Sequence, residues 1–259
     1  MAVGFPRDKV CVVPTVDLNA DLGEGCGADE EVLALVSSAS IACGAHAGDD
    51  QTMRATIEAA LEQGVSIGAH PGYADREGFG RIETGATPAA IRELILGQLD
   101  TFAGACAAAG AAFSHVKPHG ALYNAIVHHE EQAAAVVEAV VAFDPTLPVL
   151  GLPGSVWLRL AAEAGLRTVP EAFADRAYTP EGTLVSRQLP GAVLHDPDEI
   201  ARRCVAMAAG EPVTDVDGGA LTLRPGSICV HGDTTGAVAI ARAVRTALTE
   251  SGVELAPFS

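Results

Sequence analysis

The stretch VDLNADLGE, residues 16–24, decides the fold. Apolar and polar side chains alternate along it, so an extended chain points Asp17, Asn19 and Asp21 to one face. Glu24 follows in a glycine-rich loop. We predict a strand that brings Asp17 or Asn19 to the mouth of a barrel. The alternative for the same residues is a polar turn with helix caps.

The same order of signals repeats along the rest of the chain. Short apolar runs alternate with amphipathic stretches, which predicts parallel strands joined by right-handed helical crossovers. Helix starts carry N-cap residues, such as Thr87 before Pro88. We predict strands over 12–18, 38–43, 65–69, 113–117, 148–152, 166–170 and 228–230, a loop or hairpin over 173–193, and helices over 29–36, 49–63, 87–109, 130–143, 155–164, 196–209 and 235–250.

Two architectures fit this alternation, a closed or nearly closed barrel and an open doubly wound sheet. No GxGxxG follows the first strand, and no GxxxxGK[ST] occurs anywhere in the sequence. Polar residues follow nearly every predicted strand, which is where barrel enzymes keep their active sites, whereas an open sheet would gather them at one switch point. The sequence therefore predicts an α/β fold with one (β/α) barrel domain over residues 1–259.

The composition restricts the function classes. The 259 residues are 49% hydrophobic and carry a net charge of −17, which favours a packed globular protein that repels nucleic acid and anionic membranes. The six cysteines form no CxxC pair, and we find neither a secretory leader nor an apolar run of spanning length. We expect a cytoplasmic protein with no nucleic-acid and no membrane partner. Whether it forms a homo-oligomer is left open.

Two histidines follow the second and third predicted strands. His46 lies between Gly44 and Gly48, whose small size lets a ligand approach the backbone. His70 ends the third strand and opens a long glycine-rich loop that carries Arg81, a residue suited to clamping a carboxylate or phosphate. Both histidines are candidate catalytic residues, although a lone histidine is more often structural.

The segment HVKPHGALYN, residues 115–124, gives the sharpest local signal. Lys117 and His119 are two residues apart, so both side chains can point into the barrel. The chain has only two lysines, and a lysine on an apolar strand is unusual for a solvated face. We predict that Lys117 binds a phosphate or stabilises charge on an amide oxygen. Tyr123 and Asn124 either line the same pocket or pack on a helix face.

The last two strands end in further ionisable groups. Glu171 ends the sixth strand and is a candidate general base. His231 and Asp233 alternate after the last strand, in a loop that opens a helix. Backbone N–H groups at such a helix start favour anions, so we predict a phosphate cradle. Its members are Gly232, Thr234 and Thr235.

Taken in order, these segments resemble the LamB/YcsF family. The matching segments span residues 17–237 and read DLNADLGE, ACGAHAGD, GAHPGYAD with GFGR, HVKPHGALYN, EAFADRAY and HGDTTGA. Two positions depart from the family's pattern: Ala45 stands where an aromatic residue is usual, and Ile82 where a second arginine is usual. The second departure weakens any anion-binding role that needs paired arginines.

The resemblance implies both a fold and a reaction. The fold is a seven-stranded, TIM-like barrel similar to the glycoside hydrolase/deacetylase group. The reaction is the ATP-dependent hydrolysis of 5-oxo-L-proline (pyroglutamate) to L-glutamate, with this family as the A subunit beside B and C subunits. We expect ATP to phosphorylate the amide oxygen. Lys117, the predicted cradle and Mg²⁺ or another divalent metal held by Asp17 would neutralise the phosphate charge. Glu171, Asp233 or a histidine would direct water to the activated carbon.

Two other functions remain open. The first is a stand-alone metal-dependent amidase or deacetylase, because catalytic zinc or manganese sites use three protein ligands plus water. Its candidate ligands are Asp17, His46 and His70, with His119 and His231 as further members. No HxxxH or HExxH spacing supports it. The second is a non-catalytic protein that only binds substrate, against which the density of titratable groups argues.

Overall fold

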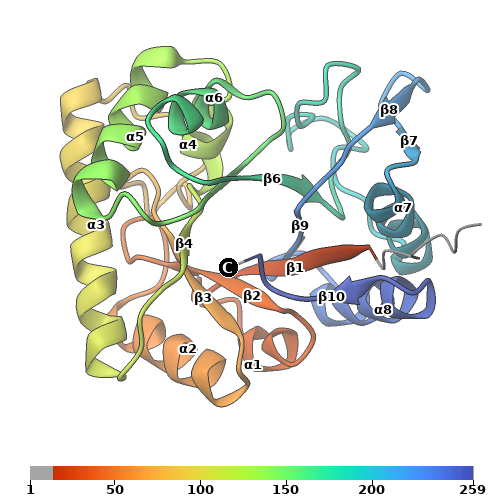
Figure 1. The fold of residues 1–259 in the computed structure, drawn as a ribbon, viewed down its shortest axis with the longest axis horizontal. Coiled ribbons are helices and arrows are strands. Elements are labelled where there is room, and N and C mark those ends of the chain that lie inside the picture. Colours follow the sequence, from red (N-terminus) through yellow and green to blue (C-terminus); the bar gives the residue numbers. More distant parts are fainter. Residues whose placement is uncertain (1–13, 259) are drawn as a thin grey trace, which may run out of the picture.

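The computed structural model describes residues 14–258, and parallel strands close into a barrel at its centre (Figure 1). Hydrogen bonds between the first and last barrel strands complete the ring. A short additional strand, β10 (Glu254–Leu255), pairs with the start of the first. In sequence order the seven barrel strands are β1 (Thr15–Leu22), β2 (Ser38–Ala42), β3 (Ser66–His70), β4 (His115–Val116), β5 (Val149–Gly151), β6 (Thr168–Phe173) and β9 (Ser227–His231).

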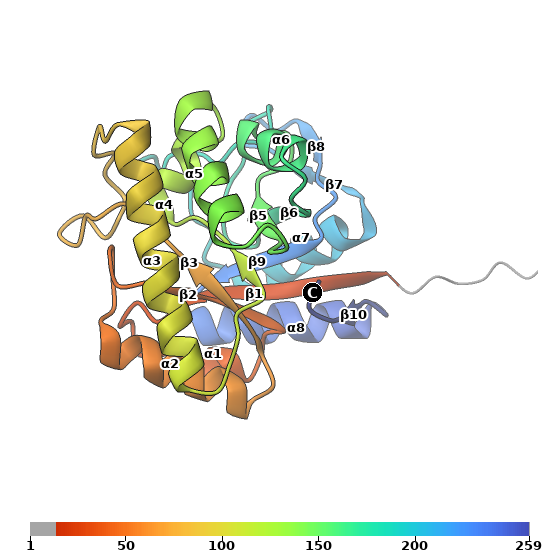
Figure 2. The same ribbon diagram turned by 60° about the vertical axis from the view of Figure 1, so that its left-hand side comes forward.

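Helices cover the outside of this barrel, with the long α3 running beside α5 (Figures 1 and 2). Side-chain caps start several of them: Asp49 accepts from the backbone N–H of Thr52, and Thr87 caps α3 directly before its proline. None of the described helices is long and apolar enough to cross a membrane. Their bounds are α1 (Asp29–Leu33), α2 (Asp50–Glu62), α3 (Pro88–Ala108), α4 (Gly120–Ala125), α5 (Glu130–Phe143), α6 (Val156–Glu163), α7 (Pro197–Ala209) and α8 (Ala237–Glu250).

The structure confirms the predicted closed barrel and places its strands close to the predicted ranges. The first strand runs on to Leu22, four residues beyond the prediction, and residues 12 and 13 lie outside the described part. No sequence signal indicated α4, β10, or the antiparallel hairpin of β7 (Pro212–Thr214) and β8 (Ala220–Thr222). The strands have only two or three residues and α4 only six, and segments this short show too little periodicity to identify an element.

The barrel interior is polar because the strands alternate. Along β1, Asp17, Asn19 and Asp21 are buried and bond to side chains of other strands. The residues between them, Leu18, Ala20 and Leu22, belong to the hydrophobic core. The interior is also tightly filled: a Cβ atom added at Gly68 would lie 2.0 Å from Nε2 of His115 on the next strand. Glycine at that position therefore makes room for the buried imidazole.

Candidate active site

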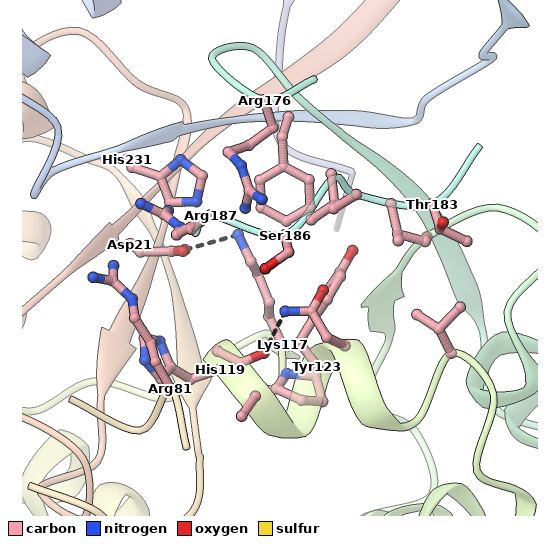
Figure 3. Close-up of a pocket in the computed structure, with 18 of the residues that line it drawn as sticks. Asp21, Arg81, Lys117, His119, Tyr123, Arg176, Thr183, Ser186, Arg187 and His231 are labelled. Carbon is pink, nitrogen blue, oxygen red and sulfur yellow. Dashed lines mark hydrogen bonds and ion pairs between the residues drawn. The ribbon is translucent and has the colours of Figure 1, made fainter. Parts of the chain in front are cut away.

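A cavity of about 590 Å³ lies at the carboxyl ends of the barrel strands (Figure 3). Its floor is built from residues at the ends of five strands, and its rim from the loops around residues 78–82 and 183–188. This is the end of the barrel at which active sites of this architecture occur. The floor residues are Asp21, His70, Lys117, Phe173 and His231.

Lys117 is the centre of a buried ionic network. Its Nζ lies 2.7 Å from Oδ1 of Asp21 and 2.7 Å from Oε1 of Glu171. It also contacts Oδ1 of Asn19 at 3.0 Å and Sγ of Cys229 at 3.1 Å. Only 1% of the lysine is exposed, so water contributes little to solvating its charge. The two carboxylates and the amide oxygen take over that role.

The network fixes the charge states of its members. Burial alone would lower the pKa of Lys117, but the charge of Asp21, with help from Glu171, raises it well above the usual value. Burial would raise the pKa of Asp21, but His70 and Lys117 hold it well below its usual range. The lysine is therefore an ammonium and Asp21 a carboxylate at neutral pH.

A second buried group joins three histidines to Glu24. Nδ1 of His119 lies 3.0 Å from Nε2 of His70 and 3.3 Å from Oε1 of Glu24. Nε2 of His46 lies 3.3 Å from the same carboxylate oxygen, and its ring stacks on that of His119 at 3.8 Å. Burial raises the pKa of Glu24 to about 8 and lowers the pKa of His119 to about 3. Donor atoms of Glu24, His70 and His119 lie within 4.8 Å of one another, which is close enough to share a metal ion.

The third element of the site is an Asp–His pair. Nδ1 of His231 donates to Oδ1 of Asp175 at 2.7 Å, and the hydroxyl of Thr234 donates to the other oxygen of that carboxylate at 2.7 Å. The ring of His231 stacks on Phe173 with 5.2 Å between centroids. Burial would raise the pKa of Asp175, but His231 and these hydrogen bonds lower it to about 2. This bond orients the imidazole and fixes Nδ1 as the donor, so in the neutral ring Nε2 is the acceptor nitrogen.

Arginines from the two rim loops face the cavity (Figure 3). Arg81 forms an ion pair with Asp233 and lies over the ring of Phe79 at 4.9 Å. Arg176 is buried, and its guanidinium donates to the backbone carbonyls of residues 185 and 192. Arg187 has no carboxylate within 4.0 Å among the described residues. The rim therefore offers positive charge to an anionic ligand, although the chain as a whole is strongly acidic.

Most of the predicted site residues meet at this cavity. Those that line it are His70, Arg81, Lys117, His119, Tyr123, Asn124, His231 and Asp233. Three others lie one layer behind: His46 packs behind His119, while Asn19 and Glu171 hold Lys117 from below. Glu171 is thus not placed to meet a substrate as a general base, and its contact with the site runs through Lys117. The catalytic roles of all these residues remain predictions.

The prediction that Asp17 or Asn19 faces the barrel mouth is wrong for Asp17. Its oxygens accept from the hydroxyls of Ser37 at 2.7 Å and Ser38 at 2.8 Å, and from Ser227. Ser38 and Ser227 begin β2 and β9, so these contacts lie at the amino-terminal end of the barrel. Asp17 therefore does not join His46 and His70 in a metal site, and the predicted ligand set of those three residues does not assemble.

The predicted phosphate cradle does not line the cavity either. Gly232, Thr234 and Thr235 lie beyond its floor, and the Thr234 hydroxyl is already bonded to Asp175. Helix α8 begins only at residue 237, with Gly236 as its N-cap. Asp233 adds a negative charge to the loop, which opposes phosphate binding unless Arg81 neutralises it.

The sequence prediction did not assign three functional groups. Asp21 and Glu24 were visible in the first motif, but nothing in the sequence distinguished Asp21 from Asp17. Asp175 follows Glu171 by four residues, and only the fold brings it to His231. A rule that favours the last polar residue of each strand would have selected Asp21 over Asp17.

Comparison with known proteins agrees with this geometry. The model of the LamB/YcsF family matches residues 16–259. The chain belongs to that family. Two of its relatives are named as the A subunit of 5-oxoprolinase. That of Cutibacterium acnes is 51% identical, and the match covers 93% of this chain and 98% of that protein. That of Streptomyces griseus is 53% identical, and the match covers 94% of this chain and 100% of that protein.

Solved structures support the family and the barrel. The lactam utilization protein of Thermus thermophilus superposes with a TM-score of 0.88 at 43% identity, over 94% of this chain and 100% of that one. A family 4 carbohydrate esterase from Streptomyces lividans gives a TM-score of 0.51 at 14% identity, over 95% and 93% of the two chains. The likeness to the esterase shows the fold alone.

Proposed function

We propose that this chain is the A subunit of an ATP-dependent 5-oxoprolinase that opens 5-oxo-L-proline to L-glutamate together with B and C subunits. The observation that carries the proposal is the agreement, over nearly the whole chain, with relatives that are named as the A subunit of 5-oxoprolinase. The name of the Thermus relative, a lactam utilization protein, supports a cyclic amide as substrate. The cavity is of a size that suits a small ligand.

The chemistry explains why ATP is needed. A five-membered lactam is a resonance-stabilised amide that re-forms readily, so its hydrolysis needs a driving force. The amide oxygen attacks the γ-phosphorus of ATP, ADP leaves, and the ring carbon becomes a good electrophile. Water then adds to that carbon, the carbon–nitrogen bond breaks as the nitrogen takes a proton, and the resulting acyl phosphate reacts with a second water to give glutamate and phosphate.

The residues of this chain fit the hydrolytic half of that sequence. His231, oriented by Asp175, is the group best placed to take a proton from water, because the bond from Nδ1 to Asp175 leaves Nε2 as the nitrogen that faces away from that carboxylate. Arg187 on the rim suits the carboxylate of the substrate. Lys117 places a fixed positive charge beside the floor, where negative charge develops on oxygen.

The proposal is tested with the three purified subunits, ATP and 5-oxoproline, with glutamate as the measured product. Lys117→Met is expected to abolish ATP-coupled turnover, and His231→Gln to lower it by about 10²–10⁴-fold. His195→Gln, an exposed histidine outside the cavity, is the matched control and should leave the rate unchanged.

The outcomes separate the alternatives. Near-normal turnover by Lys117→Met would refute the role of the lysine. No glutamate from the wild-type complex would refute the oxoprolinase itself. Amide hydrolysis by this chain alone, without ATP or partners, would support the metal-dependent amidase. Binding of 5-oxoproline without any chemistry in the complete mixture would support a carrier role.

A further inference from the structure

Nε2 of His70 and Nδ1 of His119 face each other at 3.0 Å, deep in the barrel mouth. The opposite nitrogen of each ring bonds to a backbone carbonyl. Nδ1 of His70 lies 2.7 Å from the carbonyl oxygen of Lys117, and Nε2 of His119 lies 2.8 Å from that of Phe79. A carbonyl oxygen only accepts hydrogen bonds, so each of those ring nitrogens must carry a proton.

The two facing nitrogens therefore both bear lone pairs when the rings are neutral. Oε1 of Glu24 adds a third lone pair, 3.3 Å from Nδ1 of His119. When Glu24 is ionised and both rings are neutral, three acceptors face one another in a region that water barely reaches, because these residues are at most 8% exposed. Either a proton or a metal ion between the lone pairs relieves this repulsion.

The backbone is built to hold this arrangement. Phe79, whose carbonyl fixes the proton on His119, has a φ of +56°, an unfavourable conformation for a residue with a Cβ atom. The neighbouring Gly80 also has a positive φ, and a Cβ there would lie 2.7 Å from atoms of both His119 and His46. Histidines that bind metals usually donate their other ring N–H to a carbonyl or carboxylate, which fixes the tautomer, and the strained backbone at Phe79 supplies such a carbonyl.

We propose that Glu24, His70 and His119 bind a divalent transition-metal ion, with Zn²⁺ as the ion that the geometry suits best. Two imidazoles and one carboxylate form a ligand set of catalytic zinc sites, which leave a fourth position for water. A tetrahedral ion with bonds of 2.0–2.1 Å separates its ligand atoms by about 3.3 Å. The distances of 3.0 and 3.3 Å between the donor atoms match that spacing.

The neighbouring groups complete the site. Oδ2 of Asp21 lies 3.4 Å from Nε2 of His70 and faces the same space. Nε2 of His46 lies 3.3 Å from Glu24 and orients that carboxylate from behind. Because Glu24, His70 and His119 all line the cavity, the fourth position of the ion opens toward the substrate. The ion would polarise a carbonyl oxygen or activate water there.

This inference deepens the proposed function, and only the part that the ion plays in the reaction depends on it. Ion binding is therefore measured without substrate. The chain is freed of metal with a chelator and titrated with Zn²⁺ by calorimetry, and Co²⁺ serves as a second probe whose visible absorption reports tetrahedral coordination. We expect one ion per chain and tetrahedral Co²⁺ bands.

Variants identify the ligands. Glu24→Gln and His119→Gln should each weaken Zn²⁺ binding by more than the 10–100-fold that loss of an outer contact typically causes, and should remove the Co²⁺ bands. His195→Gln should bind as the wild type does. Circular dichroism and melting of the metal-free proteins establish that the variants are folded. Should a ligand variant fail to fold, Phe79→Gly, which frees the carbonyl that orients His119, is expected to weaken binding by about 10–100-fold.

Folded wild-type protein that binds no stoichiometric ion would overturn the proposal, because a proton on His70 would then bridge the lone pairs. Undiminished Zn²⁺ affinity in both ligand variants would overturn the assignment of residues. Full 5-oxoproline turnover by metal-free protein in the complete complex would remove the ion from the reaction and leave the proposed function standing.

Discussion

Replacing Lys117 by methionine removes the ammonium of the buried network and leaves its acceptors in place. Oδ1 of Asp21 and Oε1 of Glu171 each lie 2.7 Å from the ammonium, and no other described cation lies within 4.0 Å of Glu171. Methionine fills a similar volume, so packing changes little. The perturbation is therefore chiefly electrostatic.

Breaking a buried ion pair by removing one partner costs about 3–5 kcal/mol, because the remaining charge is buried without compensation. Here Glu171 loses its one cation among the described residues, while Asp21 keeps His70 at 3.4 Å and the amide oxygen of Asn19 loses a donor, so we expect a cost within that range. A domain of this kind has a total stability of about 5–15 kcal/mol. Lys117→Met should thus remove a large part of the free energy of unfolding and lower the urea midpoint accordingly.

Equilibrium urea unfolding, followed by circular dichroism at neutral pH, measures this free energy. The triple variant Lys117→Met/Asp21→Asn/Glu171→Gln has the same methionine but neither of the two carboxylates that contact the ammonium, and it should regain at least about 2 kcal/mol relative to the single variant. A loss of less than about 1 kcal/mol in Lys117→Met, or no recovery in the triple variant, would refute the view that the lysine neutralises the floor.

Three further outcomes follow from individual contacts. Asp175 has a folded pKa of about 2, below the unfolded value, so its contribution of about 2.5 kcal/mol to the free energy of unfolding is complete above about pH 4 and is lost as pH falls toward 2. In urea unfolding, the stability difference between wild type and Asp175→Asn should therefore shrink over that pH window. Gly68→Ala should lower the free energy of unfolding by about 1–3 kcal/mol and the melting temperature by several degrees, because the new Cβ meets His115. The double variant with His115→Ala should lose less free energy than the two single variants combined, and simple additivity would contradict the predicted clash. Arg187→Gln should raise the Michaelis constant for 5-oxoproline by about 10–100-fold with kcat little changed, and an unaltered constant would show that the substrate carboxylate binds elsewhere.

The barrel was predictable because its signals are local. Helices α2, α3, α6 and α7 begin at a capping side chain within their own sequence, and most strands have an apolar run before a polar residue. Alternation of these elements restricts the topology to parallel strands. The hairpin of β7 and β8 escaped prediction because each strand has three residues, half of a usual strand length, and its turn residues resemble an ordinary loop.

The pairing of ionisable groups was not predictable from the sequence. His231 and Asp175 are 56 residues apart, and His70 and Glu24 are 46 apart by their numbers, so no local pattern reports these contacts. The tautomers of His70 and His119 depend on two backbone carbonyls, one of which lies in a loop with a positive φ. Such loop geometry follows from tertiary packing, and residue type alone does not indicate it.

The wrong prediction for Asp17 shows that the sequence does not determine how deep along the barrel axis a residue lies. Alternation decides whether a side chain points inward, and it assigned Asp17 and Asp21 correctly to the same face. The depth of a residue along the barrel axis depends on where its strand begins relative to its neighbours. Four residues of strand correspond to about 13 Å, enough to move a carboxylate from the floor of a cavity to the far end of the barrel. The pairing of Asp17 with Ser227, and of Asp21 with His231, sets that depth, and it arises only when β1 and β9 meet to close the ring.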